Sequence, residues 1–336
     1  MGVCNRKIVF FLPYKASMWD SMETVWRAAE KDTDTDAFVM PIPYYDKDEN
    51  GNLGDIHWEG KLFPSDVPIV DYKRINLQAI HPDMIFIHNP YDDGNVITSV
   101  DSEYYCGNLY SWTDMLVYIP YFVLNDKYYH YNTVKKFANT SGVVYAHKTI
   151  LQSEQMKKMY IDTLADLYGE DKRGFFEGKI VGWGSPKFDK VLAPELSGIN
   201  IPAAWDKLII KEDGSRRKVI LYNIALAEML EFRERTIEKI KRVLGIFKEN
   251  RDRVVLLMRP HPLIKTALES MAPAIKQEYE LLIDNYKSAG WGIYDDTPDL
   301  DRAIAMSDAY YGGSSSLVQL FEKAGKPIMI QNVNVL

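Results

Sequence analysis

The sequence has little cysteine, no long apolar run and no excess of basic residues. Two cysteines in 336 residues, Cys4 and Cys106, show no metal-ligand spacing, which predicts a reducing compartment and no disulfide framework. The apolar run at 8–12 is too short for a signal peptide, and no apolar stretch approaches 18 residues, so we expect no membrane-spanning helix. Lys and Arg number 40 against 47 Asp and Glu, a net charge of −7 that argues against a nucleic-acid partner.

What is present is ordinary for a soluble protein, with 46% hydrophobic and 26% charged residues. The length favours two domains. In the first half, apolar runs with helical segments between them predict strands at 8–13, 37–43, 83–89, 116–121, 143–146 and 179–181. A polar stretch at 46–71 interrupts the alternation, and a loop of this length is typically functional.

The same alternation returns in the second half, after a stretch rich in Pro, Gly and charge at 194–216. The predicted strands lie at 218–222, 253–258, 292–294, 309–311 and 327–330. We therefore expect an N-terminal acceptor domain at 1–193, a linker at 194–216 and a C-terminal donor domain, for the nucleotide diphosphate, at 217–336. Repeated βα units predict two Rossmann-like, doubly wound parallel sheets that face each other across a cleft, the arrangement called GT-B. GT-B proteins usually add a C-terminal helix; the sequence ends six residues after Ile330, so the helix is either absent or truncated.

Arg259 and His261 stand at the end of a predicted buried strand, within Arg-Pro-His-Pro. Residues two apart in an extended chain point to the same side, and the prolines stop the strand. An arginine beside an imidazole suits a diphosphate, because the guanidinium neutralises charge and the ring donates a hydrogen bond or moves a proton. The alternative is a loop whose histidine only caps a neighbouring helix.

A second strand end carries Gly312, Gly313, Ser314, Ser315 and Ser316 and opens a predicted helix. The glycines permit close backbone approach, and a serine can cap the helix. The unpaired N–H groups at a helix start favour a phosphate. An ordinary serine cap is the alternative reading.

These motifs and their order resemble the C-terminal domain of the CDP-glycerol glycerophosphotransferases, the teichoic-acid polymerase family, over about 217–330. The resemblance rests on Arg259–Pro262, 295–297, 307–309, 314–316 and 325–328. It implies that His261 and the serines bind the donor's diphosphate with support from Arg259. It further implies that Thr297 lies by the nucleotide and that Glu322 can contact a ribose, although a solvated helix face explains Glu322 equally well.

Two departures from the family pattern concern the transferred group and the acceptor. Gly312-Gly313 replaces the usual Asp-Tyr, and no His-Gly segment follows an N-terminal strand. The stretch 182–189 resembles the family's hinge, with Lys187 in place of Arg. His88 and Asp92 follow a predicted strand and are our candidates for an acceptor base and its orienting partner, while a strand-end histidine before a plain turn is the alternative.

The leading hypothesis is a transferase that moves a glycerophosphate-like or glycosyl group from a CDP- or UDP-linked donor, CDP-glycerol first, to a hydroxyl of a surface polymer. His261 or His88 would take the proton, and we expect the chemistry to need no metal ion. The expected partners are this donor and a polymer or lipid-linked acceptor, in the cytoplasm with peripheral contact to the inner membrane face. The alternatives are an enzyme like the nucleotide-sugar 2-epimerases and a catalytically degenerate binding protein.

Overall fold

The computed structural model describes residues 6–126, 131–192, 201–297 and 299–331. Contacts divide the chain into an N-terminal unit, Met1–Lys190, and a C-terminal unit, Val191–Leu336. Within the described ranges, no helix is long and apolar enough to cross a membrane.

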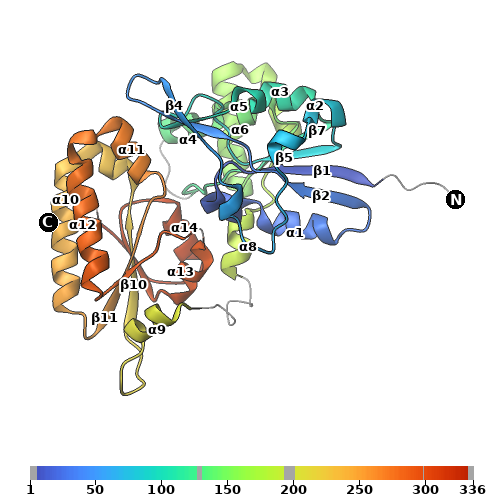
Figure 1. Cartoon of the computed structure of the whole chain (residues 1–336). Coiled ribbons are helices and arrows are strands. Elements are labelled where there is room, and N and C mark those ends of the chain that lie inside the picture. Colours follow the sequence, from blue (N-terminus) through green and yellow to red (C-terminus); the bar gives the residue numbers. More distant parts are fainter. Residues whose placement is uncertain (1–5, 127–130, 193–200, 298, 332–336) are drawn as a thin grey trace. The chain divides into compact units, whose positions relative to one another are not determined.

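The N-terminal unit is built on a parallel six-stranded sheet of order β2-β1-β5-β7-β8-β9 (Figure 1). Its strands are β1 (Lys7–Leu12), β2 (Thr35–Val39), β5 (Met84–Ile87), β7 (Met115–Tyr118), β8 (Lys148–Ile150) and β9 (Ile180–Val181). The connections contain α1 (Glu23–Lys31), α2 (Leu77–Ile80), α3 (Cys106–Ser111), α4 (Tyr131–Ala138), α5 (Ser141–Tyr145), α6 (Glu154–Tyr168) and α7 (Arg173–Lys179), and α8 (Pro186–Leu192) follows the last strand. Short 3-10 helices lie at Ala16–Ser21, Gly60–Leu62, Tyr72–Arg74, Ser102–Tyr104 and Glu170–Lys172.

Strand β1 of this sheet is buried on both faces, as expected for a parallel sheet covered by helices. Phe10 and Leu12 pack into one core cluster, and Val9 and Phe11 pack into a second cluster with Trp26 of α1. The strand order changes direction between β1 and β5, which makes their carboxyl ends the topological switch point.

A small antiparallel sheet of order β4-β3-β6 occupies part of the predicted polar loop at 46–71. Its strands are β3 (Tyr44–Lys47), β4 (Leu53–His57) and β6 (Thr98–Val100). A second difference lies at 143–146, where we predicted a strand. The structure has helix α5 there and places the strand at Lys148–Ile150. Val143 is buried in the core. A short apolar segment of this kind is compatible with a buried helix or a buried strand, so its pattern does not distinguish the two.

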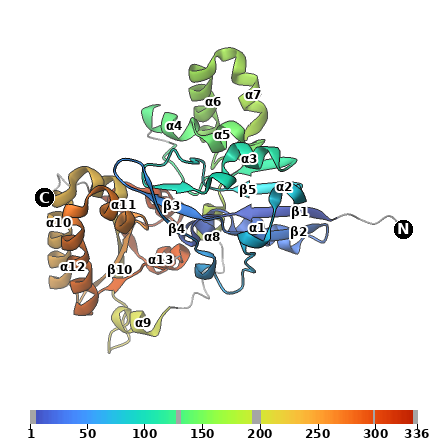
Figure 2. The same cartoon turned by 45° about the horizontal axis from the view of Figure 1, so that its top comes forward.

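The C-terminal unit carries a parallel five-stranded sheet of order β12-β11-β10-β13-β14. Its strands are β10 (Lys218–Ile224), β11 (Val254–Pro260), β12 (Ile293–Tyr294), β13 (Ala309–Gly312) and β14 (Ile328–Ile330). Its helices are α9 (Ala203–Ile209), α10 (Leu226–Glu249), α11 (Ile264–Met271), α12 (Pro273–Ala289), α13 (Leu300–Met306) and α14 (Ser316–Lys323). Helices α10 and α12 lie side by side on one face (Figures 1 and 2). The switch point here is between β10 and β13.

Candidate functional site

The ends of β10 and β13 meet at the switch point of the C-terminal unit, where Gly312 pairs with Asn223. Gly312 has φ +139, and a Cβ atom on it would lie 2.3 Å from the Asn223 carbonyl oxygen. A Cβ on Gly313 would lie 2.7 Å from a carboxylate oxygen of Glu228 and 2.9 Å from the Cβ of Ala225. Position 312 therefore requires glycine for the close approach of two backbones, and a side chain at 313 would crowd Glu228 and Ala225, which is a physical reason for the departure from Asp-Tyr.

Helix α14 begins directly after this contact. Ser315 is its N-cap residue, and its side chain accepts a hydrogen bond from the Leu317 N–H. The Tyr310 hydroxyl donates to the Gly313 carbonyl and lies 3.2 Å from the Ser315 hydroxyl. These contacts hold the turn between β13 and α14 in place. Ser314 is exposed and Ser316 is half-buried. The first N–H groups of a helix have no acceptor within it, so this start can hold an anion.

His261 follows β11 on the other side of β10. Its backbone N–H donates to the Ile224 carbonyl at the end of β10 (3.1 Å), and its ring Nδ1 accepts the Leu263 N–H (3.1 Å). In the neutral ring the proton therefore lies on Nε2, which makes the half-buried imidazole a donor. His261 and Gly313 thus flank the end of β10 at a separation of roughly two strand spacings, about 10 Å.

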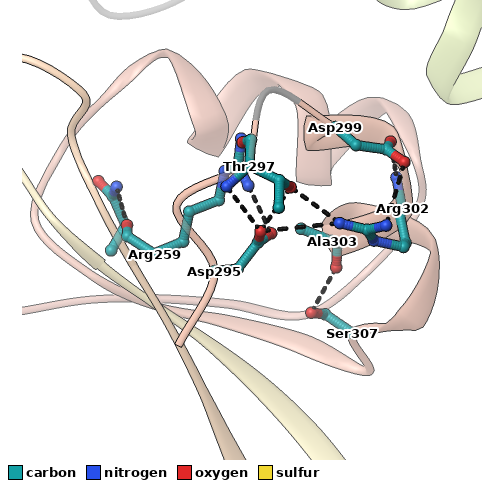
Figure 3. A network of polar contacts seen from close by, with 8 residues as sticks. Arg259, Asp295, Thr297, Asp299, Arg302, Ala303 and Ser307 are labelled. Atoms are coloured by element: carbon teal, nitrogen blue, oxygen red, sulfur yellow. Dashed lines mark hydrogen bonds and ion pairs between the residues drawn. The ribbon is translucent and has the colours of Figure 1, made fainter. Parts of the chain in front are cut away.

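Arg259 binds residues of the loop that follows β12. Its buried guanidinium forms an ion pair with Asp295 and donates to the Thr297 carbonyl at 2.7 Å (Figure 3). The fully buried Asp295 carboxylate also accepts the Thr297 N–H and hydroxyl, and that hydroxyl accepts a bond from Arg302. Arg259 and Thr297 therefore hold the loop after β12, and a direct contact of Arg259 with the diphosphate stays a prediction.

Glu322 and Lys187 are the remaining predicted donor residues. Glu322 lies on the exposed side of α14, past its first turn. Lys187 belongs to the N-terminal unit, where it is buried and forms an ion pair with Asp20. Loss of either partner would leave a buried charge unmatched, so this pair holds Lys187 within its own unit. The donor contact implied by the hinge resemblance stays a prediction.

His88 and Asp92 do not form the predicted pair. Nε2 of His88 accepts the Tyr14 N–H at 3.1 Å, and Nδ1 lies 3.0 Å from the Ser21 hydroxyl. Ser21 itself donates to the Met18 carbonyl, so the Nδ1 proton points to Ser21. Asp92 instead accepts the Cys106 N–H at 2.9 Å. Both ring nitrogens are therefore occupied, and His88 ties the ends of β1 and β5 together instead of serving as a base.

This arrangement predicts a pH-dependent stability for the N-terminal unit. Burial lowers the pKa of His88 to about 3, against about 6.5 in an unfolded chain. The contribution is fully present above pH 6.5 and is lost as pH falls toward 3, since the unfolded chain then binds the extra proton. From pH 7 to pH 5 we expect a loss of about 2 kcal/mol, read from hydrogen exchange of β1 and β5.

The His88→Gln variant should show a shallower loss over the same interval, because its side chain does not titrate. His81→Gln is the matched control, since His81 is exposed and should leave the slope unchanged. An identical slope in His88→Gln and the parent protein would show that His88 does not carry this dependence.

Lys15 and the Asp46–Asp71 stretch meet at the end of β1. The buried Lys15 amino group donates to the Tyr44 hydroxyl at 2.6 Å, which donates to Glu59 at 2.8 Å. Glu59 also accepts the Ala16 N–H at 2.8 Å. Burial lowers the pKa of Lys15. The polar stretch is thereby anchored to the switch point, and Glu59 is an anchoring residue that our sequence analysis missed.

A second missed feature is the start of α10. Arg233 has φ +42 inside this helix, and the resulting break folds the first turns back, so that the Thr236 hydroxyl donates to the Glu228 carbonyl at 3.0 Å. Lys239, buried, donates to Glu228 at 2.6 Å. These contacts span eight and eleven residues, so helical spacing could not reveal them. They place the Glu228 carboxylate beside Gly313.

Comparisons with known proteins support the fold. No family model matches, and no curated protein matches. A UDP-GlcNAc 2-epimerase from Methanocaldococcus jannaschii, in complex with UDP-GlcNAc and UDP, has a TM-score of 0.57 at 13% identity, covering 96% of this chain and 83% of its own. The chain has a GT-B-type fold.

Two further epimerases agree with the GT-B assignment. A putative UDP-N-acetylglucosamine 2-epimerase from Listeria monocytogenes has a TM-score of 0.55 at 14% identity, covering 97% of this chain and 79% of its own. The enzyme from Neisseria meningitidis, bound to UDP-GlcNAc, has a TM-score of 0.55 at 13% identity, covering 98% and 84%. The predicted pair of Rossmann-like sheets is thereby confirmed.

Proposed function

We propose that the chain is an enzyme that binds a nucleoside-diphosphate-linked donor at the switch point of its C-terminal unit. The observation that carries this proposal is the start of α14. Ser315 caps the helix immediately after the Gly312-Gly313 contact with β10, and the exposed Ser314 precedes it. Parallel sheets bind ligands beyond the carboxyl ends of their strands at this kind of point.

The diphosphate would lie between the α14 start and His261. Two strand spacings separate them, and each supplies hydrogen-bond donors: the helix start through N–H groups and serine hydroxyls, and His261 through Nε2. Arg259, Asp295 and Thr297 hold the neighbouring loop in place, where the nucleotide would lie. Solved epimerases of the same fold contain UDP or UDP-GlcNAc, which supports a nucleotide ligand of this class.

The reaction that we propose is transfer of a glycerophosphate-like or glycosyl group to a hydroxyl of a surface polymer, with CDP-glycerol as the first donor to test. The acceptor oxygen forms a bond to the donor's phosphorus or anomeric carbon, and the bond to the leaving nucleotide breaks. The helix start and His261 stabilise the charge that develops on the departing phosphate. His88 cannot take the hydroxyl proton while both its nitrogens are occupied, so in this proposal the proton passes to a phosphate oxygen of the departing nucleotide. We place the reaction in the cytoplasm, with an acceptor at the inner membrane face.

A 2-epimerase reaction on a nucleotide sugar is the second candidate. Two observations favour it. The solved epimerases match over 96–98% of this chain. In the N-terminal unit, where we expect the acceptor, both ring nitrogens of His88 are already hydrogen-bonded. Such an enzyme converts its donor without any acceptor, whereas a transferase releases nucleotide only when an acceptor is present.

A thermal-shift panel tests the proposal, because a ligand of the native state raises its apparent stability. We expect CDP-glycerol, CDP-ribitol or a UDP-sugar to shift the transition of the full chain, and free nucleosides to leave it unchanged. The ligand that binds is then incubated with and without a polymer acceptor. Nucleotide release that requires the acceptor supports transfer, and product without acceptor supports epimerisation. Binding without any turnover would indicate a degenerate binding protein, and no shift with any member contradicts the donor site.

A further inference from the structure

A small apolar hollow lies at the carboxyl ends of β7 and β8 in the N-terminal unit. Its walls include Phe122, Leu124, Leu151, Met156 and Tyr160. No charged side chain lines it, so neither a phosphate nor a carboxylate would find a counter-charge there. Its enclosed part takes about one water-sized or methyl-sized group.

Ser185 also lines this hollow and supplies a polar atom without a partner. The side chain is 6% exposed, and its hydroxyl has no hydrogen-bond partner among the described residues. The other polar wall residue, Gln152, is already satisfied, because its amide bonds both the N–H and the carbonyl of Leu124. A buried hydroxyl without a partner destabilises a fold, so an occupant of the hollow is its natural partner.

The loop that carries Ser185 is held in place by its glycines. A Cβ on Gly182 would lie 2.5 Å from the backbone at the start of α6, and Gly184 has φ +117 and donates to the Leu151 carbonyl at 3.1 Å. Between them, Trp183 is 71% exposed. The loop therefore presents a large aromatic face two residues from the buried hydroxyl, and such faces pack against other rings.

We propose that this hollow is an acceptor subsite for the uncharged acyl group of an acyl-substituted sugar, such as an acetamido group. The acyl methyl would fill the apolar part, the Ser185 hydroxyl would donate to the acyl oxygen, and the sugar ring would pack on Trp183. The inference rests on the proposed function, together with our expectation that the N-terminal domain binds the acceptor. It adds the chemical class of the acceptor that the N-terminal unit would bind.

Saturation-transfer and titration NMR on the full chain test the subsite without any nucleotide. The probe is methyl 2-acetamido-2-deoxy-β-glucopyranoside, and methyl β-glucopyranoside is the control sugar. We expect binding of the acetamido sugar, with the largest saturation on its acetyl methyl, and no measurable binding of the control sugar. Ser185→Ala should weaken binding about tenfold, as loss of one buried hydrogen bond does.

Thr149→Val is the matched control variant. Thr149, in β8, is also fully buried with an unpartnered hydroxyl but does not line the hollow, so its replacement should leave sugar binding unchanged. Equal binding of both sugars, no binding of either, or full affinity in Ser185→Ala would each overturn the subsite and leave an ordered water as the occupant. Donor binding in the thermal-shift panel is independent of these outcomes, so failure of the subsite and failure of the proposed function are distinguishable.

Discussion

Replacement of Gly312 by alanine is expected to destabilise the C-terminal unit by roughly 4 kcal/mol and to abolish donor binding. The backbone at φ +139 is one that alanine adopts only with strain, and the new Cβ would lie 2.3 Å from the Asn223 carbonyl oxygen. That oxygen belongs to the central strand β10 and cannot move aside as a flexible side chain would. The strain therefore falls on the edge that carries the α14 start.

The measurement is hydrogen exchange of peptides from β10 and β13, followed with denaturant in the full chain. Gly245→Ala is the matched control, because no atom within 4 Å would meet its Cβ in helix α10. We expect it to stabilise that helix by about 0.5–1 kcal/mol. Unchanged protection of β10 and β13 in Gly312→Ala would contradict the close approach on which the site is built.

Arg259→Met should cost about 3 kcal/mol in the same unit, since it leaves the fully buried Asp295 carboxylate without its ion-pair partner. Arg302 lies 3.8 Å from this carboxylate and compensates only in part. Removing both charges in Arg259→Met/Asp295→Leu should recover a large share of the stability, because an apolar pair has no buried charge to satisfy.

The donor affinity of the double variant distinguishes a loop-holding role of Arg259 from a direct contact with phosphate. If Arg259 only holds the loop, the double variant regains stability and binds the donor within about threefold of the parent protein. Arg253→Met is the control, since Arg253 is exposed just before β11 and its loss should change stability by less than about 0.5 kcal/mol. A double variant that is stable but binds the donor at least tenfold more weakly would show that Arg259 contacts the diphosphate directly.

The sequence predicted those features of the fold and the site that depend on the local pattern of residues. Alternating apolar runs gave the two parallel sheets, and glycines before serines gave the strand end and capped helix at Gly312–Ser316. Local chemistry is sufficient there, because a tight approach needs glycine and a helix start needs a side-chain acceptor.

The partners of charged and polar side chains could not be predicted in this way. Arg259 takes Asp295 from a loop 36 residues away, and His88 bonds the backbone of Tyr14, 74 residues earlier. The two-residue alternation of a strand places Arg259 and His261 on one side but does not say which neighbour each reaches. For this reason the predicted His88–Asp92 pair is not formed, and the partner of Arg259 was not foreseen.

The central claim is that the α14 start and His261 together hold a diphosphate. The most direct test is calorimetric titration of the full chain with CDP, CMP and cytidine, and with the corresponding uridine compounds. The account predicts that the diphosphate of one series binds at least tenfold more tightly than its monophosphate, and that His261→Ala removes most of this difference while the chain stays folded. Equal affinities for diphosphate and monophosphate, or a His261→Ala variant that retains the full preference, would contradict it.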